Sequence, residues 1–421
     1  MSERRSSEKR SFLKALGPGL VTGAADDDPS GIGTYSQVGA QFGYKLAWTM
    51  PFAYPFLAAT QLICGEVGAV TGRGISENLK RNYSPWILRG AVTLLLIANI
   101  INLGSDLGAM GAVVAMLVPG PAILFTLGFG LLCAALEIWV SYARYARLLK
   151  WATLSLFAYV GVLLAADVDW PAATSGLLIP SFGFGREEAM ALVAVFGTTI
   201  SPYLFFWQAG QEVEEQHENH ERPLRSRGPK RSRQSIKQIR TDTLVGMAFS
   251  HGVALAIMLA TAATLHAHGV TNIESASQAA EALRPVAGNL AFALFAIGIV
   301  GTGLLAVPVL AGSAAYAVSE TLGWAEGLTK KPGEAKGFYS VIVIATIAGV
   351  GLNLTGIDPM KALYWSAVVN GLLAPPLMVI LMLMASNPKV MGTLTISPIL
   401  KAFGWASTAV MSGVALLFLL S

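Results

Sequence analysis

Eleven long apolar stretches follow one another through almost the whole chain, and no other feature restricts its fold as strongly. A helix needs about 20 mostly apolar residues to cross a bilayer. The stretches cover 13–40, 44–71, 88–117, 121–142, 149–167, 188–213, 242–267, 288–318, 338–355, 361–385 and 400–420. Charged residues make up only 13% of the chain, about half the share in an ordinary soluble domain. We therefore predict an all-α polytopic membrane protein with eleven transmembrane helices.

The basic residues fall mainly on one side of these spans. If the N-terminus lies in the cytoplasm, the cytoplasmic segments hold 25 of the 29 Lys and Arg residues, as the positive-inside rule requires. An odd number of spans then places the C-terminus outside. We expect residues 1–12 to form a cytoplasmic tail and residues 13–421 to form a single transmembrane transport domain in the cell membrane. The hydrophilic stretch 211–240 and the outer segments 168–187 and 264–287 are expected to be connections.

Two spans contain helix breakers at membrane depth. The first span reads GPGLVTGAADDDPSG, with Pro29 directly after three aspartates, and the sixth reads VAVFGTTISPYLFF, with Pro202 near its middle. Proline has no N–H, so it frees the carbonyl four residues earlier, here the carbonyls of Ala25 and Thr198. Free carbonyls inside a membrane are tolerated only where they line a polar cavity or contact a ligand.

The two breaks lie five spans apart, so their helices run in opposite directions. This pattern is typical of an inverted repeat with its binding site near the bilayer midplane. We predict one repeat over about 13–167, a second over about 188–385 and an extra helix over about 400–420. Two unrelated proline kinks stay the alternative, because Pro and Gly are common in membrane helices.

Asp28 lies directly at the first break. A carboxylate inside a membrane is costly and usually marks an ion path. With the freed carbonyls and the Ser201 hydroxyl, it would offer only oxygen ligands, which suit Mg²⁺, Ca²⁺ or Mn²⁺. Successive residues of a helix point in different directions. We therefore expect Asp26 and Asp27 to serve water or a neighbouring helix.

These residues resemble the Nramp family of divalent-metal transporters. The first span and the following GAQFGYKLAW are similar to the family's first helix, with its Asp-Pro-Gly-Asn motif. The sixth span resembles the family's Gly-Ala-Thr-Val-Met-Pro-His helix. The resemblance covers nearly the whole chain and implies the LeuT-type fold, an inverted five-helix repeat with helices 1 and 6 broken.

The resemblance also implies a set of metal-binding positions. The family's metal-binding Asp falls on Asp28, and its carbonyl donors fall on Ala25 and Thr198. Its Asn falls on Gly31 and its Met falls on Ser201, so both of these side chains are lost here.

The proton-handling positions are changed as well. The family's two His residues fall on Tyr203 and Gln208, and the Glu of its third helix falls on Ala109. Asp106 is kept in the sequence SDLGAM, and Asn370 lies one turn after the position of a glutamine common in the tenth span. Asp106 and Asn370 are further candidates for the cavity.

Together these changes favour a hard ion. Thioether sulfur is a soft ligand, so losing the Met removes a preference for soft transition metals. The emptied volume leaves room for a partly hydrated ion, which suits Mg²⁺ because it dehydrates reluctantly. The chain thus resembles the Nramp-related magnesium transporter branch. We expect uptake of partly hydrated Mg²⁺, and also of Mn²⁺, without proton coupling.

Two alternatives stay open. One is a proton-coupled Mn²⁺ or Fe²⁺ transporter of the Nramp type, and the other is a LeuT-fold amino-acid symporter. The sequence contains no nucleotide-binding motif and no nucleophile–base pairing, so we expect a carrier and no enzyme. We expect no cofactor besides the transported ion. The expected partners are the metal ion and the lipid bilayer, with neither nucleic acid nor an obligate protein partner.

Overall fold

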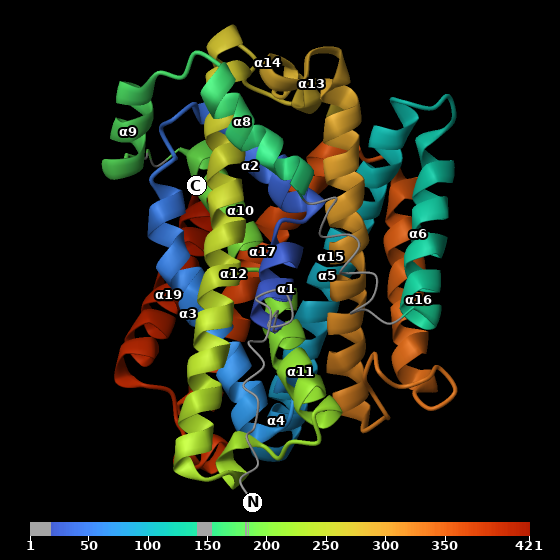
Figure 1. Cartoon of the computed structure of the whole chain (residues 1–421), viewed down its shortest axis with the longest axis vertical. Coiled ribbons are helices and arrows are strands. Elements are labelled where there is room, and N and C mark those ends of the chain that lie inside the picture. The colour runs from blue at the N-terminus through green and yellow to red at the C-terminus, as the bar shows by residue number, and fades with distance from the viewer. Residues whose placement is uncertain (1–17, 141–153, 182, 184) are drawn as a thin grey trace, which may run out of the picture.

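The computed structural model describes residues 18–140, 154–181, 183 and 185–421 (Figure 1). The predicted tail 1–12 and parts of the first, fourth and fifth spans lie outside the described residues. The described chain is helical and contains no β-strand.

Nine helical segments of the described chain are long and apolar enough to cross a membrane. They are α3 (Thr49–Thr71), α5 (Pro85–Ala115), α6 (Ala122–Trp139), α10 (Arg186–Thr199) with α11 (Pro202–Glu218), α12 (Pro229–Thr264), α15 (Ala291–Leu322), α16 (Lys336–Leu352), α17 (Pro359–Ala385) and α19 (Pro398–Leu420). The remaining two predicted spans are the broken first one, α1 (Pro18–Asp26) with α2 (Pro29–Phe42), and the fifth, described from η2 (Leu154–Leu156) through α8 (Phe157–Ala165). The number of predicted spans therefore agrees with the fold.

Both predicted breaks are present, between α1 and α2 and between α10 and α11. Each second half begins with proline, Pro29 or Pro202, at the helix position where a missing N–H removes no hydrogen bond. Figure 1 shows α2 above α1 and α10 above α11, so the two broken spans run in opposite directions. The halves also pair, because α1 contacts α11 and α2 contacts α10.

The helices pack in two groups. One group joins α1, α2, α3, α11 and α12, and the other joins α5, α6, α15 and α16. Helix α17 contacts both groups, through α2 and α3 on one side and α5 on the other. The broken spans therefore lie where the two groups meet.

Burial separates the central helices from the peripheral ones. In the most apolar stretch of the span 186–218, 94% of the residues are buried, against 22% in α6. Large apolar side chains such as Leu131 and Leu164 are 74% and 86% exposed. In a bilayer these side chains would face lipid tails, which accept them without cost.

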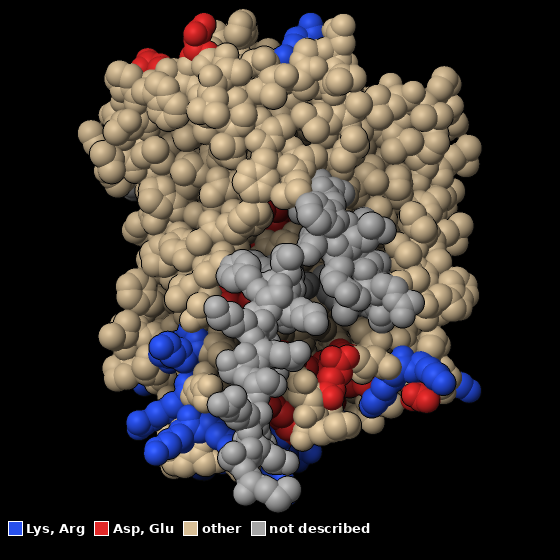
Figure 2. All heavy atoms as spheres, viewed as in Figure 1, with Lys and Arg blue, Asp and Glu red and all other residues tan. Residues whose placement is uncertain are grey.

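One end of the molecule is basic. Figure 2 shows Lys and Arg side chains gathered at the end where Figure 1 places α4 (Ile75–Asn82) and the first turns of α12. The middle of the same face carries few charges, apart from acidic side chains in a recess at mid-height. We call the end that carries these Lys and Arg side chains the basic end. The charge-poor band above it matches a membrane-spanning region.

The predicted connections contain more helix than expected. Helix α11 continues to Glu218 and α12 starts at Pro229, so only 219–228 lies between them, including η3 (Leu224–Ser226). Leu224 is buried and anchors this turn, which explains why the polar stretch is ordered. The outer segments contain α9 (Trp170–Leu178), η4 (His266–His268), α13 (Ala276–Glu281), α14 (Arg284–Ala287) and η5 (Gly288–Leu290). Near other helix ends lie η6 (Asn353–Thr355) and α18 (Pro388–Met391).

Candidate metal-binding site

Local sequence holds Asp28 at the first break. Asp28 is the N-cap residue of α2, and its Oδ1 accepts the N–H of Gly31 at 2.6 Å. A carboxylate in this position satisfies a free N–H of the first turn and meets the positive end of the helix dipole. The side chain is only 1% exposed. The acid predicted as the central ligand is therefore buried and held in one orientation.

Three further donors surround the Asp28 carboxylate. The Ser30 hydroxyl donates to Oδ1 at 2.8 Å, and Asn102 Nδ2 donates to Oδ2 at 2.8 Å. The Tyr203 hydroxyl approaches Oδ2 at 3.4 Å. Ser30 and Tyr203 each carry one hydroxyl hydrogen, which Asn102 Oδ1 or the Ala25 carbonyl can accept instead. An ion that binds Asp28 can therefore displace either hydroxyl, because each has a second acceptor.

Asn102 connects the predicted site residues, although the sequence analysis did not select it. Its Nδ2 donates to Asp28 and also to Asp106 Oδ2, at 3.2 Å. Its Oδ1 accepts from Asn370 Nδ2 at 2.9 Å and from the Ser30 hydroxyl at 3.2 Å. The structure thus brings Asp106 and Asn370 to Asp28 through one amide. A signal was present, because Asn102 precedes Asp106 by one helical turn, so the two side chains lie on the same face of the helix.

The second break brings its own oxygens to the same place. The Tyr203 hydroxyl donates to the freed carbonyl of Ala25 at 3.1 Å. The Ser201 hydroxyl contacts the freed carbonyl of Thr198 at 2.8 Å and that of Gly197 at 2.9 Å. Both carbonyls predicted as ligands therefore accept hydroxyl hydrogen bonds in this conformation. The donors of these bonds, the Tyr203 and Ser201 hydroxyls, lie at the second break. A small rotation of either side chain would free the carbonyl oxygen that it contacts.

Gly31 lies where the two breaks approach each other closely, and the open volume predicted at this position is not present. A Cβ atom at Gly31 would lie 3.3 Å from Asp28 Oδ1 and 3.3 Å from Thr198 Oγ1. Thr198 Oγ1 is buried and has no hydrogen-bond partner in the described chain. A side chain at position 31 would thus point between an acid and a free hydroxyl, which is where an ion or its water would lie.

The altered proton positions do not form one path. Ala109 is buried and apolar. Gln208 accepts from the Thr22 hydroxyl at 2.5 Å and donates to Glu212 Oε1 at 3.1 Å. Gln208 therefore links α1 to α11 on the side of the site that faces the basic end, whereas Tyr203 lies in the site itself. The described residues offer neither an acid at 109 nor an imidazole at 203 or 208 to carry a proton.

The donor set consists of oxygen. In the described part of the chain, no three His, Cys, Asp or Glu side chains are grouped as metal ligands. A cation at the breaks would therefore meet the single carboxylate of Asp28, backbone carbonyls and hydroxyls. Such a set suits a hard ion that keeps several waters.

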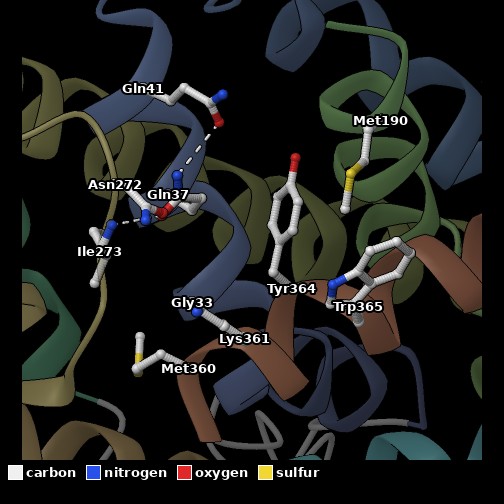
Figure 3. Close-up of a pocket in the computed structure, with 10 residues that line it drawn as sticks. All are labelled: Gly33, Gln37, Gln41, Met190, Asn272, Ile273, Met360, Lys361, Tyr364 and Trp365. Atoms are coloured by element: carbon white, nitrogen blue, oxygen red, sulfur yellow. Dashed lines mark hydrogen bonds between the residues drawn. The ribbon is translucent and has the colours of Figure 1, made fainter. Parts of the chain in front are cut away.

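A cavity of about 220 Å³ lies on the side of the site away from the basic end (Figure 3). Its lining comes from Gly33, Gln37, Gln41, Met190, Asn272, Ile273, Met360, Lys361, Tyr364 and Trp365, which include no acid. Gln37 and Gln41 present amides that hydrogen-bond each other at 3.3 Å. Leu363 packs so closely on Gly33 that a Cβ there would lie 2.9 Å from Leu363 Cδ1. The only charged residue that lines the cavity is Lys361, so the cavity offers a cation no anionic ligand.

The fold and the paired breaks define an all-α membrane transporter of the inverted-repeat class. A manganese transporter from Eremococcus coleocola, in complex with an aromatic bis-isothiourea substituted compound, has the same fold with a TM-score of 0.76. That structure is 16% identical and the match covers 100% of this chain and 88% of that chain. Mhp1, a nucleobase-cation-symport-1 family transporter, matches with a TM-score of 0.61 at 13% identity, over 96% of this chain and 90% of that chain. At such identities the likeness shows the fold alone, and it confirms the predicted LeuT-type architecture.

The family follows from the sequence comparison. Residues 19–421 match the Nramp family model, described as natural resistance-associated macrophage protein-like. The divalent metal cation transporter MntH of Klebsiella pneumoniae subsp. pneumoniae is 27% identical over 419 residues, which cover 94% of this chain and 92% of the relative. The chain belongs to the Nramp family, as its resemblance predicted.

Proposed function

We propose that this chain transports divalent metal cations across a cell membrane, mainly partly hydrated Mg²⁺ and also Mn²⁺. The observation that carries the proposal is the buried Asp28 carboxylate between two broken helices. It is surrounded by hydroxyls, amides and the carbonyls of Ala25 and Thr198. Membership in a family with divalent metal cation transporters supports the same function.

Two positions favour Mg²⁺ over softer ions. Ser201 contributes a hydroxyl where the family has a thioether, and Gly31 adds no side chain between Asp28 and Thr198. A set of hard oxygen ligands suits an ion that retains water, whereas a soft ligand would favour transition metals. These features support our proposal that the chain belongs to a magnesium-transporting branch of the family.

Proton coupling is absent in this proposal. A methyl group at Ala109, a phenol at Tyr203 and an amide at Gln208 do not load and release protons at neutral pH. The membrane potential suffices as a driving force, because two charges moving through 100 mV gain about 4.6 kcal/mol.

The basic end faces the cytoplasm in this proposal. Lys and Arg gather there (Figure 2), as the positive-inside rule requires of cytoplasmic segments. The described chain begins with α1 toward this end and finishes with α19 toward the opposite end (Figure 1). The N-terminus would thus be cytoplasmic and the C-terminus outside.

Ion flux into proteoliposomes tests the proposal. Purified protein should take up Mg²⁺ and Mn²⁺ under an inside-negative potential, and a pH gradient should not change the rate. Uptake of Mn²⁺ or Fe²⁺ only with an inward proton gradient would show a proton-coupled carrier instead. Uptake of amino acids without metal would overturn the metal site altogether.

A further inference from the structure

Asp26 and Asp27 contact a helix that the Asp28 carboxylate does not touch. Ser250 on α12 places its Oγ 2.8 Å from Asp26 Oδ2 and 3.1 Å from Asp27 Oδ1. The three side chains are buried, with exposures of 4%, 5% and 1% for Asp26, Asp27 and Ser250. Three oxygens therefore converge on the α12 side of the break, whereas Asp28 is turned toward Asn102 on α5.

This cluster has too few hydrogen atoms for its contacts. A serine hydroxyl carries one hydrogen, so Ser250 can donate to only one of the two carboxylates at a time. Asp26 Oδ1 is also buried and has no hydrogen-bond partner in the described chain. A bound cation would satisfy this oxygen.

Among the described residues, no basic side chain forms an ion pair with either of the two carboxylates. The ion pairs found within 18–140, 154–181 and 185–421 all involve other acids. A buried carboxylate without a compensating charge is strongly unfavourable, and inside a membrane it usually marks an ion path. Two adjacent carboxylates therefore make this place attractive to positive charge.

We propose that Asp26, Asp27 and Ser250 form a second cation site, separate from Asp28, that takes one divalent ion. Two carboxylates balance a divalent charge, and carboxylate, hydroxyl and water are the ligands that Mg²⁺ and Mn²⁺ accept. The identity of the ion rests on the proposed function.

The position of the pair suggests how the second site is used. Asp26 ends α1 and Asp27 follows it, so both precede Asp28 on the side of the break that leads through α1 to the basic end. An ion leaving Asp28 in that direction reaches the second site next. The pair acts as a relay between Asp28 and the basic end.

Calorimetric titration of the purified full chain with Mn²⁺ tests the second site. The unmodified protein should bind about two ions per chain, and the double variant Asp26→Asn with Asp27→Asn should bind about one. Asn has the size of Asp and still accepts from Ser250, so the fold should persist, which thermal unfolding checks. Asp28→Asn should also reduce the number to about one, and all three changes together should abolish binding.

Ser250→Ala provides a milder test with a matched control. It should weaken one of the two Mn²⁺ sites about fivefold, the effect of losing one polar contact of about 1 kcal/mol. Ser366 on α17 is equally buried, but its hydroxyl bonds only the carbonyl of Leu363 in its own helix, at 2.7 Å. Ser366→Ala should leave both affinities unchanged.

The outcomes separate this inference from the proposed function. One contrary result is that the unmodified protein binds one Mn²⁺, which is lost in Asp28→Asn and kept in the double variant of Asp26 and Asp27. That result would overturn the second site alone. No Mn²⁺ binding to the unmodified protein would overturn both proposals. Electron paramagnetic resonance of the Mn²⁺-saturated protein gives an independent readout. Two ions close together should broaden the spectrum, and the double Asn variant should lose the broadening.

Discussion

Asn102 Nδ2 lies 2.8 Å from Asp28 Oδ2 and so joins α5 to the break in the first span. The same nitrogen reaches Asp106 Oδ2 at 3.2 Å. One amide group therefore donates to two buried carboxylates and reduces the repulsion between them. This contact couples the two helix groups directly at the candidate site.

Asn102→Leu should destabilise the protein and impair transport. The change removes a donor shared by Asp28 and Asp106, and losing one buried hydrogen-bond partner costs about 1–3 kcal/mol. Denaturant unfolding in detergent and Mg²⁺ flux would measure the two effects. Asn99 is the matched control, because it lies three residues earlier on α5 and donates instead to the Leu310 carbonyl at 2.9 Å. Asn99→Leu should lose similar stability but keep its metal affinity. Equal metal affinity in the Asn99 and Asn102 variants would contradict the role of Asn102.

Asp28→Asn should remove saturable Mg²⁺ transport and leave the fold intact. Asn is as good an N-cap residue as Asp, so α2 keeps its start while the site loses its charge. Asp358 is a matched control, since it also caps a helix that begins with proline, accepting from Met360 and Lys361 at 3.0 and 3.1 Å. Asp358→Asn should transport normally. A similar Mg²⁺ rate in the Asp28 variant would show that the site has been misplaced.

Restoring two family side chains should shift selectivity toward soft ions. Gly31→Asn would add an amide between Asp28 Oδ1 and Thr198 Oγ1, which must shift to admit its Cβ, and Ser201→Met would add a thioether at the second break. The double variant should favour Mn²⁺ or Cd²⁺ over Mg²⁺ in competitive flux. Each single variant should show a smaller shift. An unchanged ion preference in the double variant would count against the cavity as the source of selectivity.

Metal uptake should not acidify the vesicles. Ala109, Tyr203 and Gln208 replace the groups that would carry a proton, and Gln208 is already bound to Thr22 and Glu212. Proteoliposomes loaded with a pH-sensitive dye should therefore take up Mg²⁺ at constant internal pH. A proton influx that scales with metal influx would return the chain to the proton-coupled carriers.

Glu326 should make stability fall as pH rises between about 4.3 and about 8. It lies in the connection between α15 and α16, where burial and the nearby negative charges of Glu77 and Glu214 raise its pKa to about 8, against the effect of Lys330. An unfolded glutamate titrates near 4.3, so the folded state holds this proton longer. Stability from this group is therefore present at low pH and is lost as pH rises from about 4.3 through about 8.

Thermal unfolding in detergent between pH 5 and 9 would measure this dependence. Glu326→Gln removes the titrating group, so the variant should lose less stability than the unmodified protein as pH rises. Glu334 is an exposed glutamate on the same connection, and Glu334→Gln should follow the unmodified protein. Identical pH profiles for the Glu326 variant and the unmodified protein would refute the role of Glu326.

The sequence alone determined the number of spans, the two breaks and the acid beside the first. These features are local, because apolar length sets a span and a proline frees the carbonyl four residues before it. Asp28 caps α2 through Gly31, only three residues away. The prolines also indicated the Ala25 and Thr198 carbonyls, with the Ser201 hydroxyl beside them, and the structure brings these groups to the two facing breaks.

Tertiary structure decided which polar groups meet at that break. Asn102 reaches Asp28 across 74 positions, Asn370 reaches Asn102 across 268, and Ser250 reaches Asp26 across 224. The local pattern of a helix does not indicate which other helix it packs against, because the apolar residues that pack membrane helices are similar from one span to another. Polar contacts form only where packing brings such helices together. The hydrogen-bonded neighbours of Asp28, and the separate contact of Asp26 and Asp27 with α12, therefore became visible only in the folded molecule.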